Sequence, residues 1–198
     1  MKQESVTALI EGLKEAGVNF VTYLPDSLSG PAFEAIRNEP SFEAVAVSHE
    51  SIGISACVGA WFGGKVPAAF ISTCGLMASA LHLTTVCRLW GVPILLVIPY
   101  RGDLGDAQPP FWVYSLTLEP VLHDLQVPYK IAGKIDEVLA GLRGLPGEQL
   151  DLDAAELGFD RGLGHDASLT GRLDQGFETV TSVIATGFVG SSAPPEAW

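Results

Sequence analysis

Short apolar runs alternate along the chain with longer segments in which apolar residues recur at helical spacing. The runs that predict strands are residues 20–24, 44–47, 68–72, 93–98 and 129–132. The segments that predict helices are an N-terminal stretch ending at Gly17, then residues 30–37, 51–62, 77–90, 115–125 and 135–142. Strands that alternate regularly with helices predict an α/β fold, with a doubly wound, mostly parallel sheet flanked by helices.

Two of these strands and one helix also carry predictions about burial. Residues 93–98 (PILLVI) are apolar at every position, as in a central parallel strand that is covered on both faces. The run 44–47 is also apolar and predicts a short buried strand. In the helix over 77–90, the spacing predicts that Leu81, Val86 and Leu89 are buried.

The pattern changes near residue 144, which divides the chain into two parts. Residues 1–143 predict one α/β domain. Residues 144–198 are acidic and rich in glycine with weak periodicity, and they predict an arm that is partly ordered at best. Within this arm, residues 179–187 (TVTSVIATG) have the composition of one more strand.

Charge and composition narrow the classes of partner. The 198 residues carry a formal net charge of -12, which argues against nucleic acid or an anionic membrane. The charged start of the chain is unlike a signal peptide, and no apolar run approaches the ~20 residues of a membrane span. The three cysteines, Cys57, Cys74 and Cys87, fall in predicted helices or turns of the apolar core and show no metal-binding spacing. We therefore expect no metal ligands in this chain and a cytoplasmic location.

The stretch from residue 44 to residue 75 joins two strand ends that can bear chemistry. Glu50 follows the first strand, and Thr73, Cys74 and Gly75 follow the second. Carboxyl ends of parallel strands meet at one edge of a sheet, where such folds bind ligands. The helix between them, 51–62, is rich in small residues and ends at Gly63 and Gly64. It can therefore approach either its own sheet or a partner closely.

Glu50 admits two interpretations from its neighbours. Apolar residues on both sides predict partial removal of its carboxylate from water, which suits a group that shares a proton. Alternatively, Glu50 lies in the first helical turn because the helix dipole favours an acid there. Its spacing alone leaves both interpretations open.

The segment SHESIGISACVGAWFGGKVPAAFIST resembles the pyrimidine-binding domain of thiamine diphosphate enzymes. Further similarity lies in FVTYLPDSLSGPAFEAI, the CGL turn, PILLVIPYRGDLGD and the EPVL helix. Together these resemble the sulfopyruvate and phosphonopyruvate decarboxylases, the sulfopyruvate decarboxylase α subunit most of all. The similarity spans residues 5–143 in consistent order.

This resemblance implies a subunit of a thiamine diphosphate-dependent decarboxylase acting on a small 2-oxo acid like sulfopyruvate or phosphonopyruvate. Glu50 matches the glutamate that hydrogen-bonds N1′ of the aminopyrimidine and so activates the cofactor. Asp26 matches an acid that faces the reacting carbon, although a turn-forming aspartate after a proline is the alternative. Thr73, Cys74 and Gly75 match the turn along the pyrimidine ring.

Three residues are weaker candidates for contacts with the substrate: Ser27, His49 and Arg101. For His49, capping of the following helix is the competing interpretation. The family turn Asn-Ser-Gly-Leu-Gly-Asn is replaced by Thr-Cys-Gly-Leu-Met-Ala, which leaves the identity of the 2-oxo acid open.

The sequence also lacks the Gly-Asp-Gly motif through which these enzymes bind Mg²⁺ and the diphosphate. We therefore expect a hetero-oligomer in which a diphosphate-binding partner subunit holds the Mg²⁺.

Two other functions compete with this one. Cys74, at a strand-to-helix turn, suits the nucleophile of a hydrolase or an amidotransferase-like enzyme. The third interpretation is a non-catalytic regulatory subunit with a degenerate cofactor turn.

Overall fold

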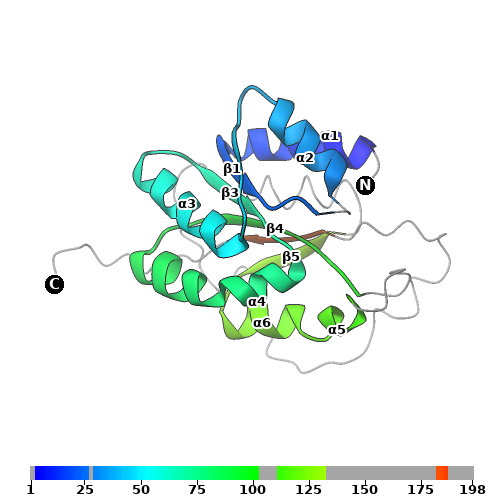
Figure 1. The fold of residues 1–198 in the computed structure, drawn as a ribbon, viewed down its shortest axis with the longest axis vertical. Helices are drawn as coiled ribbons and strands as arrows, with labels where there is room; N and C mark the ends of the chain where they lie inside the picture. The colour runs from blue at the N-terminus through cyan, green and yellow to red at the C-terminus, as the bar shows by residue number, and fades with distance from the viewer. Residues whose placement is uncertain (1–2, 27–28, 103–110, 133–181, 187–198) are drawn as a thin grey trace.

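A six-stranded sheet with helices on both faces forms the fold of the computed structural model, which describes residues 3–26, 29–102, 111–132 and 182–186 (Figure 1). The strands are β1 (Phe20–Tyr23), β2 (Glu43–Ala46), β3 (Pro67–Phe70), β4 (Leu95–Pro99), β5 (Tyr129–Ala132) and β6 (Ser182–Thr186). The helices are α1 (Gln3–Glu15), α2 (Gly30–Asn38), α3 (Glu50–Phe62), α4 (Thr73–His82), α5 (Trp112–Ser115) and α6 (Leu118–Asp124), with a π-helical segment, η1 (Leu83–Arg88), continuing α4.

The strands lie in the order β2-β1-β3-β4-β6-β5, and the first four are parallel. β6 runs antiparallel to both of its neighbours, so β5 joins the sheet through a segment near the end of the chain. The predicted α/β class with a mostly parallel sheet is confirmed, and so is the strand predicted within residues 179–187.

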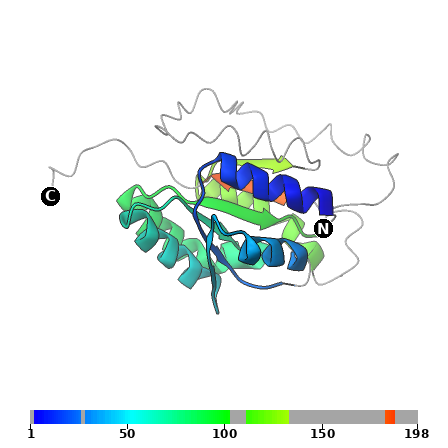
Figure 2. The ribbon, with the colours of Figure 1, turned by 90° about the horizontal axis from the view of Figure 1, so that it is seen from above.

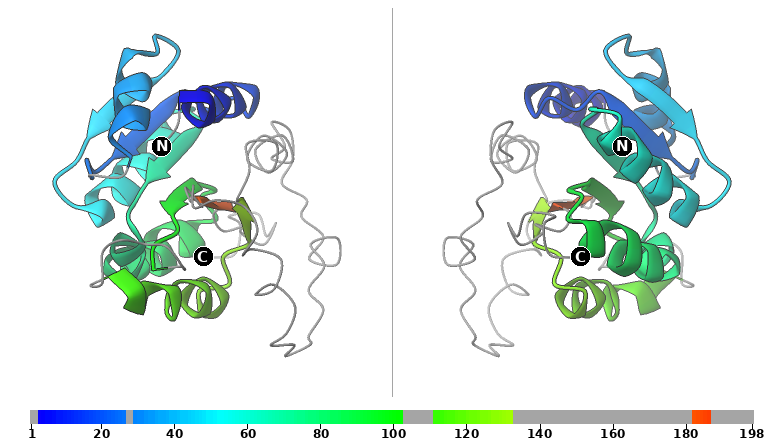
Figure 3. Two further views of the ribbon diagram at one scale, coloured as in Figure 1. Left: turned by 90° about the vertical axis from the view of Figure 1, so that its right-hand side faces the viewer. Right: turned by 90° about the vertical axis from the view of Figure 1, so that its left-hand side faces the viewer.

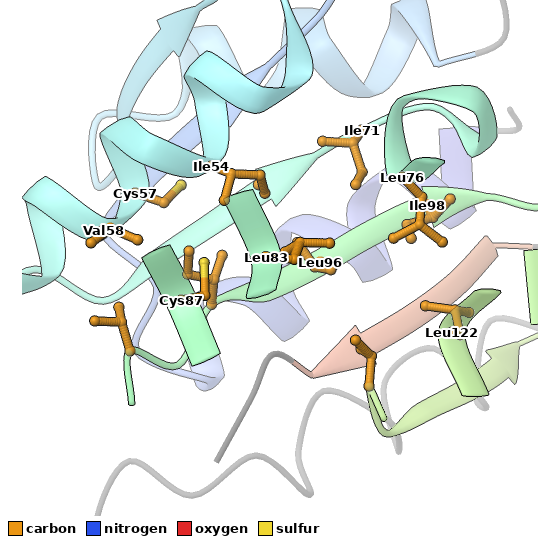
Figure 4. Close-up of a cluster of buried hydrophobic side chains, with 14 of the residues drawn as sticks. Ile54, Cys57, Val58, Ile71, Leu76, Leu83, Cys87, Leu96, Ile98 and Leu122 are labelled. Carbon is orange, nitrogen blue, oxygen red and sulfur yellow. The ribbon is translucent and has the colours of Figure 1, made fainter. Parts of the chain in front are cut away.

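Two apolar layers cover the two faces of the sheet, because successive side chains of a strand point to opposite faces. Leu95 and Val97 of β4 pack with α1 and α2, whereas Leu96 and Ile98 pack with α3, α4 and α6. Figures 2 and 3 show the helices on either side of the sheet, and Figure 4 shows the second layer. The fully buried β4 confirms the central strand predicted from its sequence.

α3 lies unusually close to β1. A Cβ built on Gly53 would come within 3.0 Å of Thr22 Oγ1, a spacing tighter than ordinary side-chain contacts. Thr22 Oγ1 is also 3.3 Å from Cys57 Sγ, inside the core. Gly63 and Gly64 end the helix as predicted, with a φ of 79° at Gly64.

Three predictions about burial were wrong. β2 has one neighbouring strand and lies at the sheet edge, where its residues are half-buried or exposed. Leu81 and Leu89 are each 67% exposed, because they lie on the outer side of α4 and of the turn after η1. Cys74 is exposed as well, whereas Cys57 and Cys87 are core residues as predicted.

The remaining predictions differ at their boundaries or fall outside the described residues. The helix predicted over 115–125 corresponds to α6, and the short helix α5 precedes it. The helix predicted over 135–142 lies outside the described residues, as does most of the segment 144–198. None of the described helices is long and apolar enough to cross a bilayer.

Candidate functional site

The candidate site lies where the carboxyl ends of the four parallel strands meet. β2 and β3 flank β1 on opposite sides, so the chain reverses its direction of winding at this point. Open α/β sheets bind ligands at such a reversal. Asp26 follows β1, Glu50 follows β2, the turn 72–75 follows β3 and Arg101 follows β4.

Glu50 is the buried charged group of this site. It is the first residue of α3, and only 7% of its surface is exposed. Ser72 Oγ donates a hydrogen bond of 2.7 Å to Glu50 Oε1. This burial agrees with the expectation that the Glu50 carboxylate is partly removed from water. Glu50 also lies in the first turn of α3, so the two interpretations of this residue are compatible.

Gly75 lies directly against the Glu50 side chain. A Cβ built at residue 75 would overlap the carboxylate, so only glycine leaves room for the acid in this position. The backbone N–H of Gly75 donates to Ser72 Oγ at 3.0 Å, which caps the N-terminus of α4. The two loops therefore meet through Ser72, with Glu50 on one side and Gly75 on the other.

Thr73 and Cys74 point in different directions. The Thr73 hydroxyl is buried and donates to the carbonyl of Pro99 at 2.8 Å, which ties the end of β3 to the end of β4. Cys74 is exposed, and its Sγ is 3.1 Å from Ser72 Oγ. Electrostatic interaction with Cys74, together with burial, raises the pKa of Tyr114, so α5 lies beside this turn.

The hydrogen bonds of Asp26 and His49 support local structural roles. Asp26 Oδ1 accepts a 2.7 Å hydrogen bond from the backbone N–H of Ser29, which is typical of a turn-forming aspartate. His49 is the N-cap of α3, and its Nδ1 is 2.7 Å from Ser51 Oγ. A substrate contact for either residue stays a prediction.

Arg101 stands 3.9 Å above the ring centroid of Phe111, in a cation–π contact. Ser27 lies outside the described residues. Among the described residues, hydrogen bonds thus join Glu50, Cys74 and Gly75 through Ser72, whereas Thr73 is held by the core.

Sequence reasoning missed two residues of this site, Ser72 and Tyr114. The predicted strand 68–72 includes Ser72, although a serine at a strand-to-helix junction is a recognisable N-cap signal. Tyr114 offered no signal, because its place beside Cys74 depends on how α5 folds back.

The hydrogen-bonding groups of this site suit an aminopyrimidine better than a metal ion. Ser72 occupies Oε1 of Glu50, and no other described residue donates to this carboxylate, so Oε2 can bind a ligand nitrogen. No group of three or more His, Cys, Asp or Glu side chains among the described residues could hold a metal ion.

No family model matches the chain, but several individual proteins are similar to it. The sulfopyruvate decarboxylase subunit alpha of Methanococcus maripaludis is 28% identical over 125 residues, which are 62% of this chain and 73% of that protein. The chain is therefore similar to sulfopyruvate decarboxylase alpha subunits. The Methanothermobacter thermautotrophicus subunit is 26% identical over 130 residues, covering 66% of this chain and 79% of that subunit.

A second group of similar proteins consists of chains longer than this one. Phosphonopyruvate decarboxylase of Streptomyces viridochromogenes is 26% identical over 102 residues, which are 52% of this chain and 26% of that enzyme. The resemblance noted in the sequence to both groups is therefore confirmed.

Proposed function

We propose that this chain is the pyrimidine-binding subunit of a thiamine diphosphate-dependent 2-oxo acid decarboxylase, a carbon–carbon lyase. One observation carries the proposal: Glu50 is buried at the winding reversal of the sheet, with one oxygen held by Ser72 and the other available. Its relatives are named decarboxylases, which agrees with this chemistry.

Glu50 would hold N1′ of the aminopyrimidine through Oε2 and share a proton with it. Gly75 and the exposed Cys74 would line the ring, while Thr73 fixes the turn from within the core. When bound, thiamine diphosphate supplies the electron sink that decarboxylation of a 2-oxo acid requires. The protein's part is to bind and orient the cofactor and to share a proton with N1′, and Glu50 suits the last of these tasks.

The diphosphate and Mg²⁺ would be held mainly by a partner subunit. The sequence has no Gly-Asp-Gly motif, and the related proteins are named as alpha subunits. A partner could dock on the outer side of α3 and of the helix formed by α4 and η1. The large apolar residues exposed there are Ile52, Trp61, Phe62, Leu81, Leu89 and Trp90.

The small residues of α3 fit both expectations for this helix, which are close packing on its own sheet and close packing on a partner. Gly53 faces β1, whereas Ser55 and Gly59 are exposed and leave room for a neighbouring backbone. The substrate in this proposal is a small 2-oxo acid with an anionic substituent, like sulfopyruvate or phosphonopyruvate, and the enzyme acts in the cytoplasm. Residues 1–143 would form the catalytic domain, with residues 144–198 as an arm that also provides β6.

The test is reconstitution with the partner. The tagged full-length chain is expressed together with the candidate subunit that carries Gly-Asp-Gly and a downstream Asn, and release of CO₂ from sulfopyruvate and phosphonopyruvate is measured with thiamine diphosphate and Mg²⁺. We expect activity that requires both subunits. Glu50→Gln should slow C2–H exchange of bound thiamine diphosphate by orders of magnitude.

The matched control is Glu43→Gln, because Glu43 is an exposed acid at the amino end of β2 that pairs with Lys65 at 3.3 Å, away from the carboxyl ends where the site lies. It should leave exchange unchanged. Normal exchange in Glu50→Gln would overturn the assigned role of Glu50, and turnover by the chain alone would overturn the shared site.

A further inference from the structure

We propose that Ser72 is a positioning residue that holds Oε1 of Glu50 and leaves Oε2 as the oxygen that meets the cofactor. The inference rests on the proposed function and concerns how the carboxylate is oriented. The Ser72 hydroxyl, like that of any serine, has one proton to donate and two lone pairs with which to accept.

All three positions of the Ser72 hydroxyl are filled. The Gly75 N–H donates to it at 3.0 Å, and its own proton goes to Glu50 Oε1 at 2.7 Å. Cys74 Sγ is 3.1 Å away. Because the single hydroxyl proton is committed to the carboxylate, Cys74 S–H must be the donor in this third contact.

The consequence is a chain of donors that runs in one direction, from Cys74 to Ser72 to Glu50. The cap on Gly75 keeps the hydroxyl oxygen in place, so its proton has one acceptor. Gly75 also closes the space beneath the carboxylate. Glu50 is thereby held from two sides, and rotation of the carboxylate plane away from this orientation breaks a hydrogen bond to a charged group.

Three variants separate this role from helix capping. Ser72→Ala removes both the cap and the donor. Ser72→Gly removes the donor but remains an acceptable N-cap residue, since glycine follows serine closely at that position. Ser72→Thr keeps the hydroxyl and should rescue both. Ser55→Ala is the matched control, because the Ser55 hydroxyl bonds the carbonyl of Ser51 within α3 and does not contact Glu50.

The first measurement needs no cofactor. Infrared spectra of the full-length apoprotein report the S–H stretch of each thiol, and subtraction of a Cys74→Ala spectrum isolates the Cys74 band. We expect this band to shift to higher frequency in Ser72→Gly and Ser72→Ala, because the S–H loses its acceptor, and to stay in place in Ser72→Thr and Ser55→Ala. The buried Cys57 and Cys87 provide internal references. An unshifted band in Ser72→Gly would overturn the donor chain.

The second measurement is C2–H exchange of thiamine diphosphate in the reconstituted complex. Ser72→Gly should slow exchange about tenfold, as expected for loss of one hydrogen bond to a charged group, whereas Ser72→Thr should exchange at the normal rate. Exchange at the normal rate in Ser72→Gly, with slow exchange in Glu50→Gln, would overturn the positioning role and leave the proposed function intact. Normal exchange in Glu50→Gln would overturn both.

Discussion

Gly75 lies so close to Glu50 that a single methyl group on residue 75 would occupy the space of the carboxylate. The acid and the glycine come from different βα junctions, one after β2 and one after β3. Their contact closes the site across β1, which lies between these two strands in the sheet. The glycine is needed here for close approach and not for an unusual backbone angle.

Gly75→Ala should therefore displace the Glu50 side chain and weaken cofactor binding at least tenfold in the reconstituted complex, as measured by calorimetric titration. Overpacking of this kind also costs about 1–3 kcal/mol of folding free energy. Gly59→Ala is the control for folding of the isolated chain, because no atom of the chain lies within 4 Å of a Cβ built there. It should gain up to about 1 kcal/mol of folding free energy, since alanine favours helices. Equal binding by the Gly75→Ala protein would contradict the contact.

Cys74→Ser distinguishes the decarboxylase from a cysteine-nucleophile enzyme. If Cys74 only lines the pyrimidine and donates to Ser72, serine should retain most of the turnover, because a hydroxyl can replace the thiol as donor. If the thiol is a nucleophile, turnover should vanish. No histidine among the described residues contacts Cys74, which favours the first outcome. Turnover with 2-oxo acids is the measurement, and loss of activity with cofactor still bound would favour the hydrolase interpretation.

Alkaline pH should destabilise the fold through its buried thiols. Burial raises the pKa of Cys57 to about 11 from its usual 9.0, with a smaller opposing contribution from the Thr22 hydrogen bonds. Since the folded-state pKa is the higher one, this stabilisation is complete below pH 9 and is lost as the pH rises from 9 to 11. The loss for one such group is about 2–3 kcal/mol.

Urea unfolding at intervals between pH 8 and pH 11 measures this effect. Cys57→Ala should show a shallower decline of the unfolding free energy over that range. It should also be less stable at pH 8, because the smaller side chain leaves a cavity. Cys87 contributes in the same direction, since burial raises its pKa to about 12. A decline as steep in Cys57→Ala as in the unaltered chain would contradict the assignment to this thiol.

Phe62→Ser and Leu81→Ser should weaken assembly with the partner subunit. These side chains are 66% and 67% exposed, so their replacement removes little from the core of the chain. The expected result is a higher dissociation constant by sedimentation and an unchanged melting temperature of the isolated chain. Glu11→Ser is a control, because Glu11 is exposed on α1, which packs on the opposite face of the sheet from α3 and α4. Equal affinity in all three variants would place the partner elsewhere.

The sequence predicted the fold best where burial on both faces leaves only apolar residues. β4 is the clearest case, since its sequence is apolar throughout and all of its residues are buried. Prediction failed at β2, where an apolar run lies on an edge, and at Leu81 and Leu89, which point outward. A stripe of apolar residues has the same spacing whether it meets the core or an outer surface.

The candidate site was predictable in part for the same kind of reason. Glu50 and Gly75 were found from their positions after strands, because parallel topology brings strand ends together. Ser72 was missed because its role depends on which of three neighbours receives its proton, and sequence spacing carries no such information. Tyr114 depends on a long-range fold-back that no local pattern encodes.

The strand β6 has a consequence for how the protein is made. β5 is synthesised long before β6, yet among the described strands it pairs with β6 alone. On the ribosome the four parallel strands can assemble first, whereas β5 can pair only after the segment 182–186 has emerged. Premature termination before that segment would leave β4 with a bare hydrogen-bonding edge, a surface that invites pairing with other chains. The sheet is therefore completed only after the whole segment between β5 and β6 has been synthesised.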